Sequence, residues 1–235
     1  RIQMKDVCFS YTKYKGQPSL TIPEAYFPSG TIIAVIGGNG AGKSTLIKII
    51  SGVYAPTSGS VLLDGKACRF HNPRQALDRG IVVIHQELSI ANDLTVAENI
   101  YLGCEPRIQN GFFLDRKKME ADAQAILDFM EVDIRSTAVA RHLTAAQQQM
   151  VEIAKAFHTN AKILIMDEPT SALTSKEIDR LFGIIKSLKE KGVGIIYISH
   201  RLEELQDIAD RVTIMRDGKF ITRGNFKDMR MDEII

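Results

Sequence analysis

The sequence lacks the features that mark a membrane-spanning or a nucleic-acid-binding protein. No apolar run approaches the roughly 18 residues that a membrane-spanning helix needs. The net charge is only +2 over 235 residues, which gives no reason to expect binding to nucleic acid. Cysteine is scarce: Cys8, Cys68 and Cys104 are scattered and fit neither a disulfide framework nor a zinc-ligand spacing. This scarcity favours a reducing compartment.

The remaining composition is that of an ordinary globular protein. Hydrophobic residues make up 45% of the chain and charged residues 25%. The length allows one large α/β domain or two smaller domains, with a substantial core in either case. Because the sequence begins with Arg1 and stops at Ile235 in the middle of a pattern, we expect it to be a piece of a longer chain.

One motif is the strongest functional signal in the sequence. Residues 37–45, which we name the phosphate loop, contain the pattern G-x-x-x-x-G-K-[ST]. The apolar residues 32–36 before it are typical of a buried strand, and residues 46–50 after it continue at helical spacing toward Gly52. The N–H groups of such a loop and of the following helix bind phosphate. The sequence therefore predicts a nucleoside triphosphate site formed by Gly38, Asn39, Gly40, Ala41, Gly42, Lys43, Ser44 and Thr45.

Strand and helix signals alternate along most of the chain. Short strands are expected within residues 2–27, which Pro18, Pro23 and Pro28 divide into pieces. Further buried strands are expected at 32–36, 81–84, 162–166 and 194–198, and hairpins with Asp-Gly turns at 60–66 and 211–223. Helices are expected at 73–80, 144–158 and 174–192. The first has Asn72 as its N-cap, and capping boxes open the other two (Thr144 with Gln147, Thr174 with Glu177). This alternation predicts a mainly parallel sheet covered by helices on both faces.

Between residues 91 and about 143 the strand signals disappear. Thr95 and Glu98 have the spacing of a capping box, and residues 115–131 are rich in helix-forming residues. We therefore expect a helical subdomain inserted between two parts of an α/β core, residues 1–90 and 144–235. The N-terminal strands form an antiparallel subdomain of that core.

Four of the expected parallel strands end in the residue types of one magnesium–nucleotide site. The first leads into the phosphate loop, the second into Gln86, the third into Asp167 and Glu168, and the fourth into His200. Such strand ends are where parallel α/β sheets bind ligands. Oxygen donors suit Mg²⁺, so Ser44, Gln86 and Asp167 are its candidate ligands.

The catalytic candidates are Lys43, Glu168 and His200. Lys43 would reach the β- and γ-phosphates, Glu168 would accept a proton from the attacking water, and His200 would contact the γ-phosphate. Taken singly, Gln86 and His200 also fit ordinary loop residues. Their order along the chain favours the site.

The order of these motifs resembles that of the ATP-binding cassette (ABC) ATPases over essentially the whole chain. The resemblance implies a P-loop NTPase (RecA-like) fold, ATP and Mg²⁺ as cofactors, and a second cassette as partner. The family's signature, Leu-Ser-Gly-Gly-Gln, opens a helix that binds the γ-phosphate held by the partner cassette. Here the corresponding residues are Leu143, Thr144, Ala145, Ala146 and Gln147. Thr144 keeps a hydroxyl group, and Ala145 and Ala146 replace the two glycines.

A further resemblance concerns Tyr11 in the segment 7–11. It resembles the aromatic residue that stacks on adenine in ABC ATPases, although the same tyrosine also fits the exposed face of a strand.

Four short segments resemble the first half of the ATP-binding proteins of bacterial monosaccharide importers, of the ribose, galactose and xylose type. These segments are residues 51–54, 85–88, 97–103 and 146–154. It implies two cassettes in one chain, membrane permease subunits, a periplasmic sugar-binding protein, and a peripheral place on the cytoplasmic side of the inner membrane. No nucleic-acid partner is expected.

Two other functions are alternatives for a sequence of this kind. A soluble ABC ATPase acting on DNA or ribosomes would have a coiled coil or a basic linker, and no sustained heptad run lies between Lys43 and Asp167. A P-loop kinase would need an arginine-rich lid, and the arginines of the helical segment are dispersed: Arg107, Arg116, Arg135 and Arg141.

Overall fold

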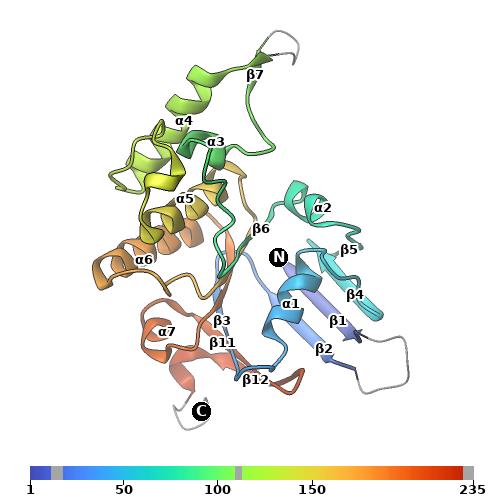
Figure 1. Ribbon diagram of the computed structural model, residues 1–235. Helices are drawn as coiled ribbons and strands as arrows, with labels where there is room; N and C mark the ends of the chain where they lie inside the picture. The colour runs from blue at the N-terminus through green and yellow to red at the C-terminus, as the bar shows by residue number, and fades with distance from the viewer. Residues whose placement is uncertain (12–17, 109–112, 230–235) are drawn as a thin grey trace. The chain divides into compact units, whose positions relative to one another are not determined.

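A computed structural model describes residues 1–11, 18–108 and 113–229 (Figure 1). The chain divides into two compact units. The first unit comprises residues 1–83, 162–168 and those from 185 onward, and the second comprises residues 84–161 and 169–184. No helix of the described residues is both long enough and apolar enough to cross a membrane.

One ten-stranded mixed sheet organises the first unit, in the order β5-β4-β1-β2-β12-β11-β3-β10-β9-β6. Its strands β11, β3, β10 and β9 are parallel neighbours, whereas β5, β4, β1 and β2 are antiparallel neighbours. The predicted parallel core and antiparallel N-terminal part are therefore both present within a single sheet. Its strands are β1 (Ile2–Phe9), β2 (Leu20–Phe27), β3 (Ile32–Ile36), β4 (Ser58–Leu63), β5 (Lys66–Cys68), β6 (Ile81–Ile84), β9 (Ile163–Asp167), β10 (Gly194–Ile198), β11 (Arg211–Arg216) and β12 (Lys219–Asn225).

The prediction that Pro23 interrupts the N-terminal strands is wrong. Pro23 lies inside β2, which is continuous from Leu20 to Phe27. The β1–β2 ladder pairs Lys5 with Glu24 and then Val7 with Ile22, so Pro23 falls at the position that the ladder skips. Proline lacks an N–H group and is tolerated in a strand where no ladder hydrogen bond is required of it.

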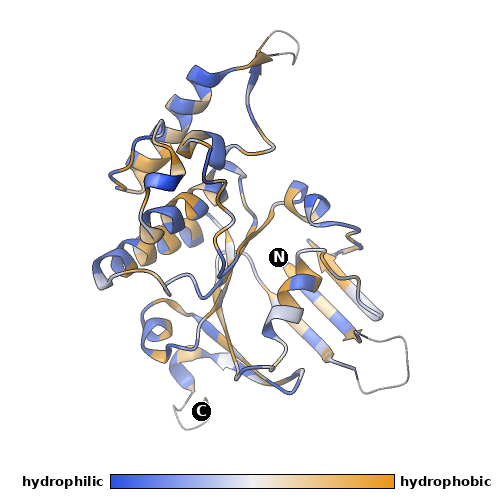
Figure 2. Ribbon diagram, viewed as in Figure 1, coloured by the Kyte–Doolittle hydropathy of each residue, from blue (hydrophilic) through white to orange (hydrophobic). Residues whose placement is uncertain are grey.

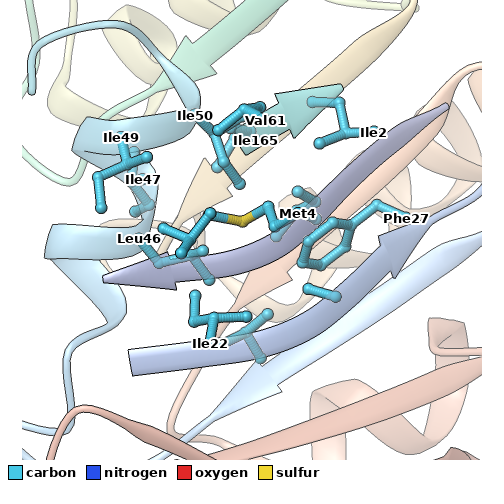
Figure 3. Close-up of a cluster of buried hydrophobic side chains, with 14 of the residues drawn as sticks. Ile2, Met4, Ile22, Phe27, Leu46, Ile47, Ile49, Ile50, Val61 and Ile165 are labelled. Atoms are coloured by element: carbon cyan, nitrogen blue, oxygen red, sulfur yellow. The ribbon is translucent and has the colours of Figure 1, made fainter. Parts of the chain in front are cut away.

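The core of the first unit lies between the sheet and α1 (Lys43–Ile50). Figure 3 shows Leu46, Ile49 and Ile50 of this helix in one buried cluster with Ile165 of β9. The same cluster includes Ile196 and Ile198 of β10. Successive side chains of a strand point to opposite faces, so Tyr197 lies on the other face. There it contacts α7 (Leu202–Ile208), a helix that the sequence reading missed.

Figure 2 shows the apolar character of the central strands, in which every residue of β3 and β10 is buried. Continuous apolar runs of this kind are expected where helices cover both faces of a parallel sheet.

The predicted turns and helix ends of the first unit are confirmed. The two hairpin turns have positive φ at Asp64 and Asp217 and at the glycine that follows each, as a tight hairpin requires. Asn72 accepts a hydrogen bond from the Gln75 N–H and caps α2 (Pro73–Asp78). A short 3₁₀ helix, η3 (Phe226–Asp228), follows β12.

The second unit is mainly helical. The Thr95 and Thr144 capping boxes are both formed, and Thr174 donates to Glu177 at the start of α6, as the spacing predicts. The expectation of helices alone between residues 91 and 143 is wrong, because a two-stranded sheet lies there. Its strands have two residues each, too few for a periodic signal. The elements are α3 (Val96–Ile100), β7 (Arg107–Ile108), β8 (Phe113–Leu114), α4 (Arg116–Phe129), η2 (Ala140–His142), α5 (Ala145–His158) and α6 (Ser175–Glu190), whose last residues belong to the first unit.

Candidate functional site

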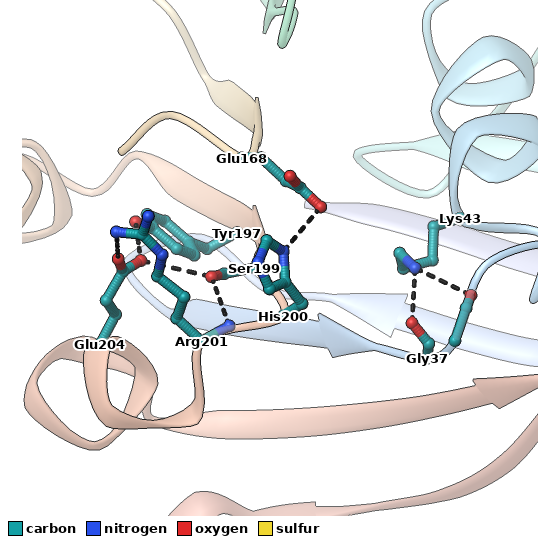
Figure 4. Close-up of polar contacts among 9 residues, drawn as sticks. Gly37, Lys43, Glu168, Tyr197, Ser199, His200, Arg201 and Glu204 are labelled. Atoms are coloured by element: carbon teal, nitrogen blue, oxygen red, sulfur yellow. Dashed lines mark hydrogen bonds and ion pairs between the residues drawn. The ribbon is translucent and has the colours of Figure 1, made fainter. Parts of the chain in front are cut away.

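The ends of three neighbouring parallel strands form the candidate site in the first unit. The register places Ile198 of β10 beside Val35 of β3 on one side and beside Asp167 of β9 on the other. The phosphate loop after β3, Glu168 after β9 and His200 after β10 therefore emerge at the same edge of the sheet, as Figure 4 shows. This edge is where open parallel sheets bind ligands.

The phosphate loop has the shape that its glycines permit. A side chain at Gly37 would meet the Met215 carbonyl oxygen at 2.4 Å, so only glycine fits against β11 there. Gly42 has φ +100 and is the N-cap of α1, with no side chain to cap the helix. A helix N-terminus without a capping side chain directs its N–H groups and a partial positive charge toward the loop. The loop is therefore suited to hold an anion.

Lys43 lies over the phosphate loop. Its Nζ donates hydrogen bonds to the carbonyl oxygens of Gly37, at 2.5 Å, and of Gly38, at 3.1 Å (Figure 4). Ser44, the next residue, is exposed. The loop thus presents an ammonium group and a hydroxyl group on adjacent residues.

Glu168 and His200 are hydrogen-bonded to each other. His200 Nδ1 lies 3.0 Å from Glu168 Oε1, and the histidine side chain is 66% exposed. The Glu168 N–H donates to the Ile198 carbonyl oxygen, yet its own φ is +49. A left-handed conformation is strained for glutamate, and strain of this kind concentrates at functional sites. It turns the Glu168 side chain away from the alternating course of β9.

Tyr11 lies beside the first turn of α1. Its hydroxyl group is 2.8 Å from the Thr45 hydroxyl, and its ring packs edge-on against Phe9 and Tyr54, with centroids 5.0 and 5.7 Å away. The Tyr11 side chain nevertheless stays 59% exposed. An aromatic ring therefore stands open to solvent next to the phosphate loop.

The remaining predicted residues belong to the second unit. Gln86 is exposed in the loop that follows β6. Thr144 is the N-cap of α5: its hydroxyl accepts from the Gln147 N–H at 3.2 Å, and its own N–H donates to Gln147 Oε1 at 3.0 Å. Ala145, in the first turn, is exposed and Ala146 is partly buried. The start of α5 is thus rigid and reachable from solvent.

Sequence reasoning missed the network behind His200. Glu204 of α7 is buried and accepts hydrogen bonds from Tyr197, Ser199 and Arg201 (Figure 4). The available signal was weak: Glu204 precedes Leu205 and Ile208 on the buried side of a seven-residue helix, where a carboxylate needs partners.

Comparison with known proteins finds relatives among sugar import ATP-binding proteins. A candidate ribose/galactose/methyl galactoside import ATP-binding protein of Agrobacterium fabrum is 53% identical over 223 residues, which are 95% of this chain and 44% of that protein. The ribose import ATP-binding protein of Geobacillus kaustophilus is 47% identical over 206 residues, 88% of this chain and 42% of that protein. The chain thus spans less than half the length of these relatives.

The fold has close counterparts among solved structures. A nucleotide-free ATP-binding cassette from an ABC transporter superposes with a TM-score of 0.82 at 26% identity, covering 95% of this chain and 90% of that one. The family model described as ABC transporter matches residues 20–171, which include the phosphate loop, Thr144 and Glu168. The chain belongs to the ABC transporter family.

Proposed function

We propose that this chain binds ATP with Mg²⁺ and hydrolyses it to drive the import of a monosaccharide. The observation that supports the proposal most directly is the meeting of the phosphate loop, Asp167, Glu168 and His200 at one sheet edge. The similarity to sugar import ATP-binding proteins supports the choice of a sugar over DNA or the ribosome.

Binding of ATP would begin at the phosphate loop. Lys43 would exchange its bonds to the Gly37 and Gly38 carbonyls for the β- and γ-phosphates, which offer stronger, charge-assisted partners. The N–H groups of residues 38–45 would surround the phosphates, and the open ring of Tyr11 would stack on the adenine.

The donors available for Mg²⁺ are the oxygen ligands that this ion prefers. Ser44 and Asp167 offer a hydroxyl and a carboxylate within the first unit. The role of Gln86 as a further ligand stays a prediction from the sequence. No group of three or more His, Cys, Asp or Glu side chains among the described residues could hold a metal by itself. Phosphate and water oxygens would therefore complete the coordination. Bound Mg²⁺ would neutralise charge on the phosphates.

Hydrolysis would use Glu168 and His200. The Glu168 carboxylate would accept the proton of the attacking water. His200, now bonded to that carboxylate, would turn to the γ-phosphate, because its exposed ring leaves it free to move. The hydrogen bond between Glu168 and His200 would then belong to the state without bound ATP.

A second cassette would complete the site. Thr144, Ala145, Ala146 and Gln147 start a helix whose N–H groups and dipole suit the γ-phosphate of ATP bound to that partner. Membrane permease subunits would use the energy of this closure, with a periplasmic protein supplying the sugar. The chain would then lie on the cytoplasmic face of the inner membrane as a peripheral subunit.

Reconstitution tests the proposal. The full-length protein would be placed in proteoliposomes with the permease and sugar-binding protein that purify with it, and uptake of labelled ribose, galactose and xylose measured with and without ATP. We expect ATP-dependent uptake of one of these sugars, abolished by Lys43→Ala. ATP hydrolysis stimulated by DNA or ribosomes, without uptake of any sugar, would contradict the proposal.

A further inference from the structure

A buried carboxylate lies behind the candidate site, on the face of the sheet that α7 covers. Glu204 accepts hydrogen bonds from the Tyr197 hydroxyl at 3.3 Å, the Ser199 hydroxyl at 3.3 Å and Arg201 Nη1 at 3.1 Å. Its side chain is only 8% exposed, and that of Arg201 is 46% exposed. Burial of a carboxylate is unfavourable unless donors satisfy it, and here three do.

Two of these donors adjoin His200 in the sequence. Ser199 precedes the histidine, Arg201 follows it, and both side chains are bonded to Glu204. The Ser199 hydroxyl also accepts from the Arg201 backbone N–H at 3.0 Å, which closes the turn across His200. One carboxylate therefore holds the backbone on both sides of the residue that faces Glu168, as Figure 4 shows.

We propose that Glu204 is a positioning residue for His200: it fixes the 199–201 turn so that the imidazole reaches the Glu168 carboxylate and, with ATP bound, the γ-phosphate. This inference rests on the proposed hydrolysis of ATP. It assigns no contact between Glu204 and the nucleotide.

Few other side-chain hydrogen bonds to described residues fix the turn. Arg201 is the N-cap of α7, but its side chain makes no capping bond to the helix. The histidine side chain itself is exposed and bonded only to Glu168 among the contacts of Figure 4. On the other side of the turn, β10 holds the backbone only as far as Ile198. The Glu204 carboxylate thus joins the strand end to the helix start.

Replacing Glu204 by glutamine tests whether it positions His200. Glu204→Gln keeps the size of the side chain but leaves one acceptor oxygen in place of two and removes the charge, so it cannot accept from the Arg201 guanidinium and from the two hydroxyls as the carboxylate does. We expect kcat for ATP hydrolysis to fall about tenfold, with KM for ATP unchanged within about twofold, because the loss concerns orientation and not binding. Glu203→Gln is the matched control, since Glu203 is the adjacent, exposed glutamate of the same helix. It should leave kcat unchanged.

A double-mutant cycle with His200 separates positioning from a general loss of structure. If Glu204 acts through His200, Glu204→Gln should lower kcat in the parent protein and cause no further loss in a His200→Ala background. An equal loss in both backgrounds, or no loss in the parent, overturns the inference. Parent protein that hydrolyses no ATP, or His200→Ala at the parent rate, overturns the assigned chemistry and the inference together.

A milder variant covers the case in which Glu204→Gln fails to fold. Tyr197→Phe removes one of the three donors and keeps the buried ring. A two- to threefold fall in kcat (about that size for one weakened neutral bond) is expected, again absent in the His200→Ala background. Thermal melting of each variant identifies any that unfold. A fall of equal size in both backgrounds contradicts the inference here as well.

Discussion

In the first compact unit, Glu168 and His200 owe their positions to strands from distant parts of the chain, whereas in the second unit Thr144 owes its position to a residue three places away. The first pair depends on the register of β9 and β10 and on the Glu204 network. The second depends on a capping box that Thr144 and Gln147 form between themselves.

The difference predicts how each region responds to damage. Strand ends are fixed by many contacts, so a change there should alter the chemistry while leaving the fold intact. A helix cap is fixed by two local hydrogen bonds, so a change there should loosen one helix end and weaken whatever that end binds. The following predictions test this contrast, from the largest expected effect to the smallest.

Replacing the proposed base should have the largest effect. Glu168→Gln should lower ATP turnover at least about 100-fold, since an amide cannot accept the proton of the attacking water. ATP affinity should be retained, and light scattering should detect an ATP-bound dimer that no longer reopens. Steady-state phosphate release measures the first effect. A variant with the parent rate would place the base at another residue.

The phosphate loop should show the next largest effect. Lys43→Ala removes the ammonium group that would neutralise the phosphates, a loss of about 2–3 kcal/mol and therefore roughly 30- to 150-fold in ATP affinity. Isothermal titration calorimetry measures the change. Lys48→Ala is a suitable control, because Lys48 lies later in α1 near Tyr54 and away from the loop. Equal affinities of Lys43→Ala and the parent would refute the assigned role of the loop.

The helix cap of the second unit should respond more weakly. Thr144→Val deletes the hydroxyl that accepts from the Gln147 N–H, which should lower the unfolding free energy by about 1 kcal/mol. Turnover that depends on a second cassette should fall too, and the ATP affinity of the single chain should stay the same. Thr144→Ser, which restores the hydroxyl, should recover both properties. Denaturant titration and the dependence of ATPase activity on protein concentration check these outcomes, and weaker ATP binding by the single chain would contradict them.

The smallest expected effect is on the pH dependence of stability, through His158 of the second unit. Burial lowers the pKa of His158, whose ring lies against Tyr101 with centroids 3.8 Å apart, while Asp122 acts in the opposite direction. The folded state therefore binds a proton at His158 less readily than the unfolded state does, so this contribution to stability is full above the ordinary pKa of about 6.5 and is lost as the pH falls below it. The urea midpoint of the parent should fall more between pH 7.5 and 5.5 than that of His158→Phe. Equal changes would refute the role of His158.

The sequence allowed more of the local structure than of the contacts to be predicted. Capping boxes at Thr95 and Thr144 and the Asp-Gly turns were readable, because each is formed within four residues. The residues at the strand ends were readable too, because each directly follows an apolar run in the sequence. Their contact was not, since the bond between His200 and Glu168 depends on how β9 and β10 pair.

Two other features lay outside what a sequence pattern reports. Pro23 was expected to end a strand, but the ladder skips its position, a result of the pairing with β1. Glu204 gave little sign of its role, because an acidic residue in a short helix usually faces solvent. Only its burial beneath three donors distinguishes it.

The left-handed backbone conformation of Glu168 lowers the stability of the fold, while its carboxylate serves the proposed chemistry. A non-glycine residue at φ +49 costs about 1–2 kcal/mol, a sizeable share of the stability of a typical domain. Glycine or asparagine would adopt this conformation more readily. A variant library selected for resistance to heat alone should therefore enrich those two residues at position 168, whereas selection for the proposed ATP turnover should retain glutamate.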